Sequence, residues 1–311
     1  MERKTLFEIK ALYRDDFRIT GFSFGKGEKA ACIVGSMRGN ENQQLYACSQ
    51  LIRKLKELEE QGCIKEGKEI LVVPCVNPYS MNIKKRFWPI DNTDINRMYP
   101  GYNEGETTQR IAAGIFEKIQ EYEYGVQLAS NYMPGEFMPY INVMTTGLED
   151  VELAKKFGLP YVVIRNSRPY DTTTLNYNWQ IWESNAFSLY TRDTDRIDEA
   201  SAQQAVSAVL RYLSRVGVVK YNCHSGYMST VINESTLAPV LTPTGGIFRP
   251  KKVPGDPVEY GEVIGEILDP LTAELSAPVT ATTSGVVFFA TDKPLVLEHE
   301  VAFKLIRRLH V

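Results

Sequence analysis

Apolar runs of strand length alternate with helical periods over the first two thirds of the chain. Residues 29–36 (KAACIVGS) form a continuous apolar run, which is typical of a strand buried on both faces. Between residues 45 and 58, apolar side chains recur at intervals of three and four, as on the buried side of an amphipathic helix. Residues 69–76 (EILVVPCV) then repeat the strand pattern.

This alternation continues to about residue 217. We expect further strands at 124–129, 161–164 and 186–190, and further helices at 111–122, 150–157 and 206–216. Such a pattern predicts an α/β domain with a mostly parallel central sheet and helices on both of its faces.

The pattern changes between Val218 and Thr230, and no helical period follows. Short β runs are instead cut by Pro and Gly, for example at 254–256. This is typical of a small all-β, barrel-like domain. The sequence therefore predicts an α/β domain over 1–220 and a C-terminal all-β domain over 221–311.

Composition and charge exclude several classes of partner. The chain has 311 residues, of which 43% are hydrophobic and 23% charged, and a formal net charge of -3. No run of Lys and Arg interleaved with aromatic residues occurs, so nucleic-acid binding is not expected. No window approaches the roughly 18 apolar residues of a membrane-spanning helix, and the N-terminus has no apolar stretch typical of a signal peptide. We therefore expect a cytoplasmic protein with no membrane partner.

Cysteine and histidine limit the metal chemistry that the sequence offers. The five cysteines are odd in number and form no CxxC pair, so we expect free, largely buried thiols. The three histidines, His224, His299 and His310, all lie in the last third of the chain. A metal site in the first two thirds would have to do without imidazole.

Polar residues cluster where the expected strands end. In a parallel sheet, ligands bind beyond the carboxyl ends of the strands, where loops carry the polar groups. The loops of this kind are 35–41, 77–101, 127–130 and 188–191.

The order and spacing of these loops resemble the succinylglutamate desuccinylase and aspartoacylase family of zinc carboxypeptidase-like hydrolases. Members typically carry His-Gly-x-Glu after the first core strand, then Asn-Pro, then an Arg followed by Asp-x-Asn-Arg-x-x-Pro-Gly, then Asp-x-His and Thr-x-Glu. The turn residues between 246 and 285 are similar to the β module of the family. The resemblance covers nearly the whole chain, and its most specific segment is 91–101.

The resemblance implies a zinc ion held by two His and one Glu, with a bound water that attacks an amide bond. At these ligand positions the sequence has Arg38, Glu41 and Ala129, and Gln127 stands where the family usually has Asp. Only Glu41 is retained, and one carboxylate is not a zinc site. We therefore expect no cofactor, although the family implies zinc, and we expect Arg38 to pair with Glu41 in place of the cation.

The residues that the family uses on its substrate are retained. The resemblance implies that Arg86 steadies the oxyanion and that Asn96 and Arg97 hold the substrate carboxylate. Tyr190 falls where the family has the Glu that moves protons.

Several of these residues also have purely structural interpretations. For Glu41 the alternative is an acid at the start of a helix, where the helix dipole favours negative charge, and for Asp91 and Asp94 it is a role in turns and caps. Tyr190 is then an aromatic residue packed on its strand, and His224 an exposed histidine in a linker. Arg165 and Arg168 either contact an anion or support the structure of their loop.

Three functional hypotheses follow. In the first, the chain is an amide hydrolase that binds metal in an altered manner. In the second, Arg38, Arg86 and Arg97 form a cationic pocket for a small carboxylate-bearing ligand, without catalysis. In the third, Tyr190 or the Cys223-His224 pair supplies different chemistry on the same fold. The second hypothesis agrees best with the loss of the metal ligands. The sequence leaves open whether the protein forms a homo-oligomer.

Overall fold

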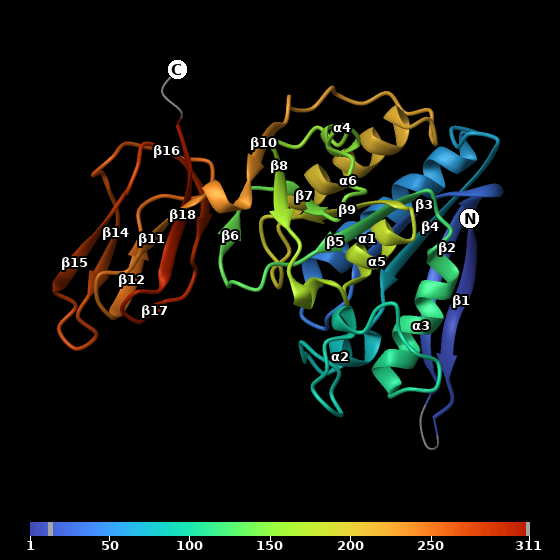
Figure 1. Cartoon of the computed structure of the whole chain (residues 1–311), viewed down its shortest axis with the longest axis horizontal. Coiled ribbons are helices and arrows are strands. Elements are labelled where there is room, and N and C mark those ends of the chain that lie inside the picture. The colour runs from blue at the N-terminus through green and yellow to red at the C-terminus, as the bar shows by residue number, and fades with distance from the viewer. Residues whose placement is uncertain (12–14, 309–311) are drawn as a thin grey trace. The chain divides into compact units, whose positions relative to one another are not determined.

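The first unit of the protein is built on one large mixed sheet. In the computed structural model, which describes residues 1–11 and 15–308, this sheet has nine strands. In spatial order they are β1 (Glu2–Ile9), β2 (Phe17–Gly25), β4 (Gly67–Cys75), β3 (Gly27–Ser36), β5 (Tyr124–Ala129), β9 (Asn185–Tyr190), β7 (Tyr140–Thr145), β8 (Tyr161–Asn166) and β10 (Thr230–Asn233) (Figure 1). Strands β4, β3, β5 and β9 run parallel to one another at its centre, as the sequence predicts.

Alternate residues of the central strands belong to two different hydrophobic cores. In β3, Ala31 and Ile33 pack into one core, whereas Cys32 and Val34 pack into the other. Because successive side chains of a strand point to opposite faces, both faces of the sheet are covered. This explains why the strand reads as a continuous apolar run.

Helices supply the other half of each core. The helices are α1 (Asn42–Glu60), α2 (Pro78–Asn82), α3 (Thr107–Ile119), α4 (Val151–Lys155), α5 (Leu175–Ile181) and α6 (Glu199–Arg215), with 3₁₀ turns η1 (Ile95–Arg97), η2 (Pro169–Asp171) and η3 (Glu234–Thr236). Helices α1 and α6 contribute to the first core, and α3 and α5 to the second. The predicted arrangement, with helices on both faces, is confirmed.

Some strands of this sheet run antiparallel to their neighbours, which the alternation of strands and helices in the sequence does not predict. Strand β1 pairs with β2, β2 pairs with β4, and β7 pairs with β9, all in antiparallel orientation. The sheet is therefore a parallel block flanked by antiparallel strands.

In the second unit, the residues that the structure describes form strands and one 3₁₀ turn, and no α-helix. Its strands are β6 (Glu136–Phe137), β11 (Ala238–Leu241), β12 (Gly246–Pro250), β13 (Pro257–Val258), β14 (Val263–Leu268), β15 (Leu275–Thr280), β16 (Gly285–Ala290), β17 (Leu295–Val296) and β18 (Val301–Arg307). They form two antiparallel sheets around a separate core.

The chain divides into these units at a different place from the expected boundary. The first unit comprises Met1–Ser130 and Pro139–Val231, and the second comprises Asn131–Met138 and Ile232–Val311. Residues 131–138 belong to the second unit because β6 pairs with β16. Within the described residues, no helix is both long and apolar enough to span a membrane.

The cysteines are free thiols, as the sequence predicts. Burial raises the pKa of the Cys32 and Cys48 thiols well above the usual range, and raises the pKa of Cys75 to about 12. Because the thiolate is the reactive form, we expect a thiol reagent at about pH 8 to modify only Cys63 and Cys223 in the native protein, and all five cysteines after denaturation. Mass mapping of the labelled peptides would measure this, and labelling of Cys48 in the native protein would contradict it.

Candidate functional site

Arg38 and Glu41 lie together in the loop between β3 and α1. Nη1 of Arg38 is 3.0 Å from Oε1 of Glu41, and the two side chains are only 4% and 1% exposed. The ion pair predicted from the sequence is confirmed. Away from water, such a pair is held by hydrogen-bond geometry as well as by charge.

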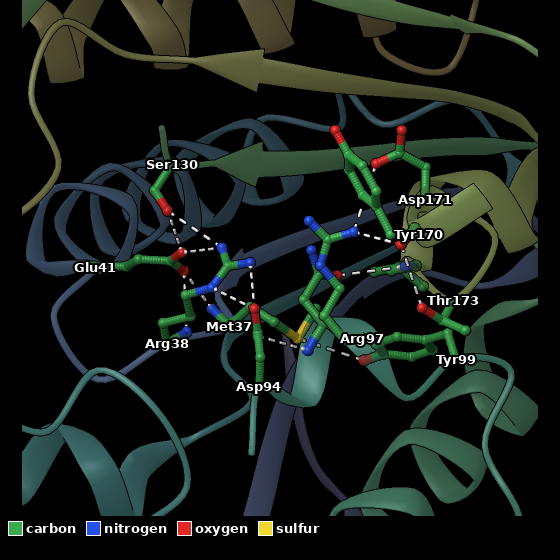
Figure 2. Close-up of polar contacts among 12 residues, drawn as sticks. Met37, Arg38, Glu41, Asp94, Arg97, Tyr99, Ser130, Tyr170, Asp171 and Thr173 are labelled. Carbon is green, nitrogen blue, oxygen red and sulfur yellow. Dashed lines mark hydrogen bonds and ion pairs between the residues drawn. The ribbon is translucent and has the colours of Figure 1, made fainter. Parts of the chain in front are cut away.

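Arg38 also contacts a second carboxylate, that of Asp94. Nε and Nη2 of Arg38 donate to Oδ2 of Asp94 at 3.1 and 2.8 Å (Figure 2). Oδ1 of Asp94 accepts the backbone N–H of Asn96 at 3.0 Å and so caps the turn η1, which confirms its predicted capping role. Asp91 takes the turn role predicted for it, since its carboxylate accepts the N–H of Thr93.

Glu41 is held by more than its arginine. Its Oε2 atom accepts the backbone N–H groups of Met37 and Arg38 at 2.6 and 3.1 Å, and its Oε1 atom accepts the hydroxyl of Ser130 at 2.5 Å (Figure 2). A carboxylate offers about four lone-pair directions, and these four donors, counting Arg38, occupy them. The residue stands at the N-cap position of α1, where a negative charge is also favoured by the helix dipole.

A glycine allows the loop to approach the next segment closely. A Cβ atom at Gly39 would lie 2.1 Å from the carbonyl oxygen of Lys85. The N–H of Gly39 donates to the carbonyl of Arg86 at 3.0 Å. This contact brings Arg86 to the loop that carries Arg38, and the Arg86 guanidinium packs over the Phe87 ring at 5.5 Å.

Asn96 and Arg97 follow Asp94 in the same turn. The side-chain oxygen of Asn96 accepts from Gln127 Nε2 at 3.4 Å and from the N–H of Leu175 at 3.3 Å. Its amide nitrogen makes no hydrogen bond to any described residue. Arg97 donates to the carbonyl of Tyr170 at 2.5 Å, and its side chain stays 23% exposed. A ligand could therefore contact the partly exposed Arg97 side chain and the amide nitrogen of Asn96.

A buried aspartate ties Arg97 to the loop after β8. The carboxylate of Asp171 is 1% exposed and lies 3.5 Å from Nη1 of Arg97. It also pairs with Arg165 and accepts the N–H of Arg168 at 3.0 Å. The Arg168 guanidinium packs over the ring of Tyr170. Of the two interpretations of Arg165 and Arg168, anion contact or loop structure, these contacts agree with loop structure.

The remaining predicted positions lie on β5 and β9. Ala129 and Tyr190 are paired residues of these neighbouring strands. The ring of Tyr190 stacks on Tyr140, with centroids 4.7 Å apart and planes at 1°. It is therefore a packed strand aromatic, whatever further role it has. The carbonyl of Ala129 accepts from Gln44 on α1 at 3.1 Å, which places the end of β5 beside the first turn of that helix.

Metal ligands are sparse around this centre. Within residues 1–11 and 15–308, no group of three His, Cys, Asp or Glu side chains is placed to hold a metal ion. His224 is exposed in the coil after α6, as predicted, and His310 lies outside the described residues.

Three contacts were not predicted. They are the bond of Ser130 to Glu41, the second carboxylate on Arg38, and the pairing of Asp171 with Arg97. Ser130 and Asp171 stand in polar segments that the sequence marks as loops, but their spacing from the arginines gives no sign of contact.

Comparison with known proteins identifies the family. Residues 28–216 match the catalytic domain described as succinylglutamate desuccinylase/aspartoacylase. The protein belongs to this family, whose members are N-acyl amino acid deacylases.

Relatives show the same fold over almost the whole chain. The structure is similar to a succinylglutamate desuccinylase/aspartoacylase from Rhodobacter sphaeroides (TM-score 0.76, 20% identity, 95% of this chain and 91% of that one). It is also similar to a succinylglutamate desuccinylase from a Silicibacter species (TM-score 0.79, 18% identity, 98% and 94%). The product-bound ectoine utilization protein EutE of Ruegeria pomeroyi gives a TM-score of 0.76 at 18% identity (94% and 90%).

A curated relative matches a shorter segment. The N-alpha-acetyl-L-2,4-diaminobutyric acid deacetylase of Halomonas elongata is 25% identical over 155 residues, which is 47% of this chain and 42% of the relative. The match thus spans less than half of the length of that protein.

Proposed function

We propose that this protein binds a small carboxylate-bearing metabolite at the position of the family's active site, without zinc-dependent hydrolysis. The observation that carries the proposal is the contact of Arg38 with Glu41 at 3.0 Å and with Asp94 at 2.8 Å. A guanidinium, which keeps its charge at all relevant pH values, takes the place of a divalent cation beside the one ligand that the family shares with this chain.

The donor set supports the absence of the family's zinc. Arg38 has no lone pair to offer a metal, and the Ala129 side chain has no donor atom. The Glu41 carboxylate is already bound by Arg38, Ser130 and two backbone N–H groups. A metal would have to displace these donors and lie next to a permanent positive charge, which is unfavourable.

The structure changes which arginine we assign to the ligand. The sequence placed Arg38 among the residues that hold a ligand carboxylate, but its buried guanidinium is shared between two protein carboxylates. We assign it instead to the maintenance of the loop. Arg97, which is partly exposed, and the amide nitrogen of Asn96 are the better candidates for direct contact. Arg86 lies beside the same loop.

The name of the curated relative supports an N-acyl amino acid or a related carboxylate as the ligand class. We expect N-acyl amino acids or free dicarboxylates to raise the melting temperature of the purified protein. Arg97→Ala should weaken binding by about tenfold to a hundredfold, since a charge-assisted hydrogen bond contributes about 1.5–3 kcal/mol. Isothermal titration calorimetry with the best compound of a thermal-shift screen would measure this.

Arg165→Ala is a matched control. Both arginines contact Asp171, so both substitutions perturb the same buried carboxylate, but only Arg97 belongs to the pair that the family uses on its substrate. Equal losses in the two variants would contradict the assignment of Arg97. Metal-dependent turnover of an N-acyl amino acid by the wild-type protein would contradict the non-catalytic part of the proposal.

A further inference from the structure

A cavity of about 400 Å³ lies beside the C-terminal half of α6 in the first unit. Its lining is entirely polar or ionisable: Ser207, Arg211, Tyr221, Asn222, Cys223 and His224. The first two residues belong to α6, and the other four belong to the coil that follows it. None of them stands at a position that the family uses for metal or substrate.

Arg211 is a charged side chain in an unusual setting. The residue is only 7% exposed, and its hydrogen bonds go to main-chain carbonyls: Nε donates to His224 at 2.7 Å and Nη1 to Phe157 at 2.6 Å. Within residues 1–11 and 15–308, no carboxylate forms an ion pair with it. Carbonyl groups satisfy its N–H donors but carry no net charge, and a buried charge is costly without a counter-ion.

A second arginine, one helical turn later, increases the positive charge. Arg215 donates to the carbonyls of Lys156 at 2.9 Å and Ser225 at 2.5 Å. It too forms no ion pair with a carboxylate in the described part of the chain. Like charges at positions i and i+4 of a helix repel each other. The two guanidinium groups therefore favour an anion between or beside them.

The backbone around Arg211 fits this side chain closely. A Cβ atom at Gly226 would lie 2.8 Å from Cζ of Arg211, and one at Gly158 would lie 3.0 Å from its Cδ. Both glycines have positive φ angles, of +73° and +64°. The N–H of Tyr227 donates to the carbonyl of Gly158 at 2.9 Å and fastens the coil to the loop before β8. The guanidinium is thus held in a fixed position, which reduces the entropy cost of binding a ligand.

We propose that this cavity binds a small oxyanion of the phosphate or sulfate class, with Arg211 as its main contact. Ser207 and Asn222 supply a hydroxyl and an amide that form no hydrogen bond to any other described residue and line the same space. Oxyanions accept charge-assisted hydrogen bonds from arginine and further bonds from such neutral donors. The volume exceeds that of an inorganic oxyanion, so the same chemistry would admit the phosphate of a small ester.

The test uses the full chain and inorganic phosphate at constant ionic strength. We expect saturable binding by isothermal titration calorimetry. Ser207→Asp places a carboxylate four residues before Arg211 on the same side of α6, so it should weaken phosphate binding by about tenfold or more. It should also raise the melting temperature in phosphate-free buffer, because it supplies the counter-ion internally. Asn222→Asp, on the exposed coil, tests the same effect without altering the helix.

Gln203→Glu is the matched control, because it makes the same change of charge on an exposed position of α6. It lies eight residues before Arg211, about 12 Å along the helix axis, which is beyond the Debye length of about 8 Å at physiological ionic strength. We expect phosphate binding within about twofold of wild type. Stronger binding of methyl phosphate than of phosphate would identify an ester as the ligand, and the reverse would identify the free anion. Absence of saturable binding, or equal weakening by Ser207→Asp and Gln203→Glu, would overturn the proposal.

Discussion

Replacing Arg38 by methionine is expected to destabilise the protein by about 3–5 kcal/mol, because removal of one partner of a buried ion pair leaves the opposite charge without its counter-ion. The substitution would leave Glu41 and Asp94, whose side chains are 1% and 11% exposed, without the cation that both contact. Methionine has a similar reach, so most of the packing is kept and the loss of charge dominates. Urea unfolding followed by circular dichroism would measure the change.

A solvent-exposed ion pair with the same sequence spacing serves as the control. Lys54 and Glu57 are also three residues apart and 2.8 Å from each other, but their side chains are 38% and 45% exposed. Solvent-exposed pairs contribute little to stability, so Lys54→Met should change the unfolding midpoint far less than Arg38→Met. If the two variants were equally stable, the Arg38 centre would not hold the loop as described.

The strands at the centre of the fold could be predicted because burial on both faces leaves a continuous apolar run. Strand β3 is the clearest example, with residues 30–36 all buried. Helix α5 was not predicted, since several of its buried residues are polar: Asn176, Asn178 and Gln180. Buried polar residues do not contribute to an apolar period, even where, as in Asn178, the side-chain amide donates to main-chain carbonyls.

The N-terminal hairpin was missed for a related reason. Strand β1 carries no fully buried residue, and four of its eight residues are charged. An edge strand of this kind has a weak hydrophobic signal, and charge on an edge strand discourages pairing with other chains. Its antiparallel pairing with β2 depends on contacts between residues of the two strands, which the hydrophobic pattern of β1 alone does not reveal.

Within the candidate site, sequence distance decides what could be predicted. Arg38 and Glu41 are three residues apart in one loop, so their pairing follows from the family motif and simple charge. Asp94 is 56 residues from Arg38, and Ser130 is 89 residues from Glu41. Only the fold brings these residues together, at the carboxyl ends of neighbouring parallel strands. The sequence therefore could not show the second carboxylate on Arg38, and the prediction that Arg38 contacts a ligand was made without it.

The combined substitution of Arg38 by His and Ala129 by His is expected to create zinc binding, which we do not expect of the wild-type protein. Together with Glu41, two imidazoles would restore the two-His, one-Glu ligand set that the family implies, with one position open to water. Both positions adjoin Glu41: Arg38 pairs with it, and the residue after Ala129 donates to it. Metal analysis after gel filtration should give about one equivalent of zinc for the double variant, and well below one for the wild type.

Zinc should also stabilise this variant, because it would replace the positive charge that Arg38 provides beside Glu41. A ligand at about 100 times its Kd stabilises the native state by about 2.7 kcal/mol, so zinc should raise the melting temperature of the double variant clearly. Each single substitution supplies only one imidazole and should show neither effect at the same zinc concentration. One equivalent of zinc in the wild-type protein would contradict the proposed function. A double variant that folds but binds no zinc would contradict the alignment of positions 38 and 129 with the zinc ligands of the family. The comparison thus tests directly whether a guanidinium has replaced the metal in this family member.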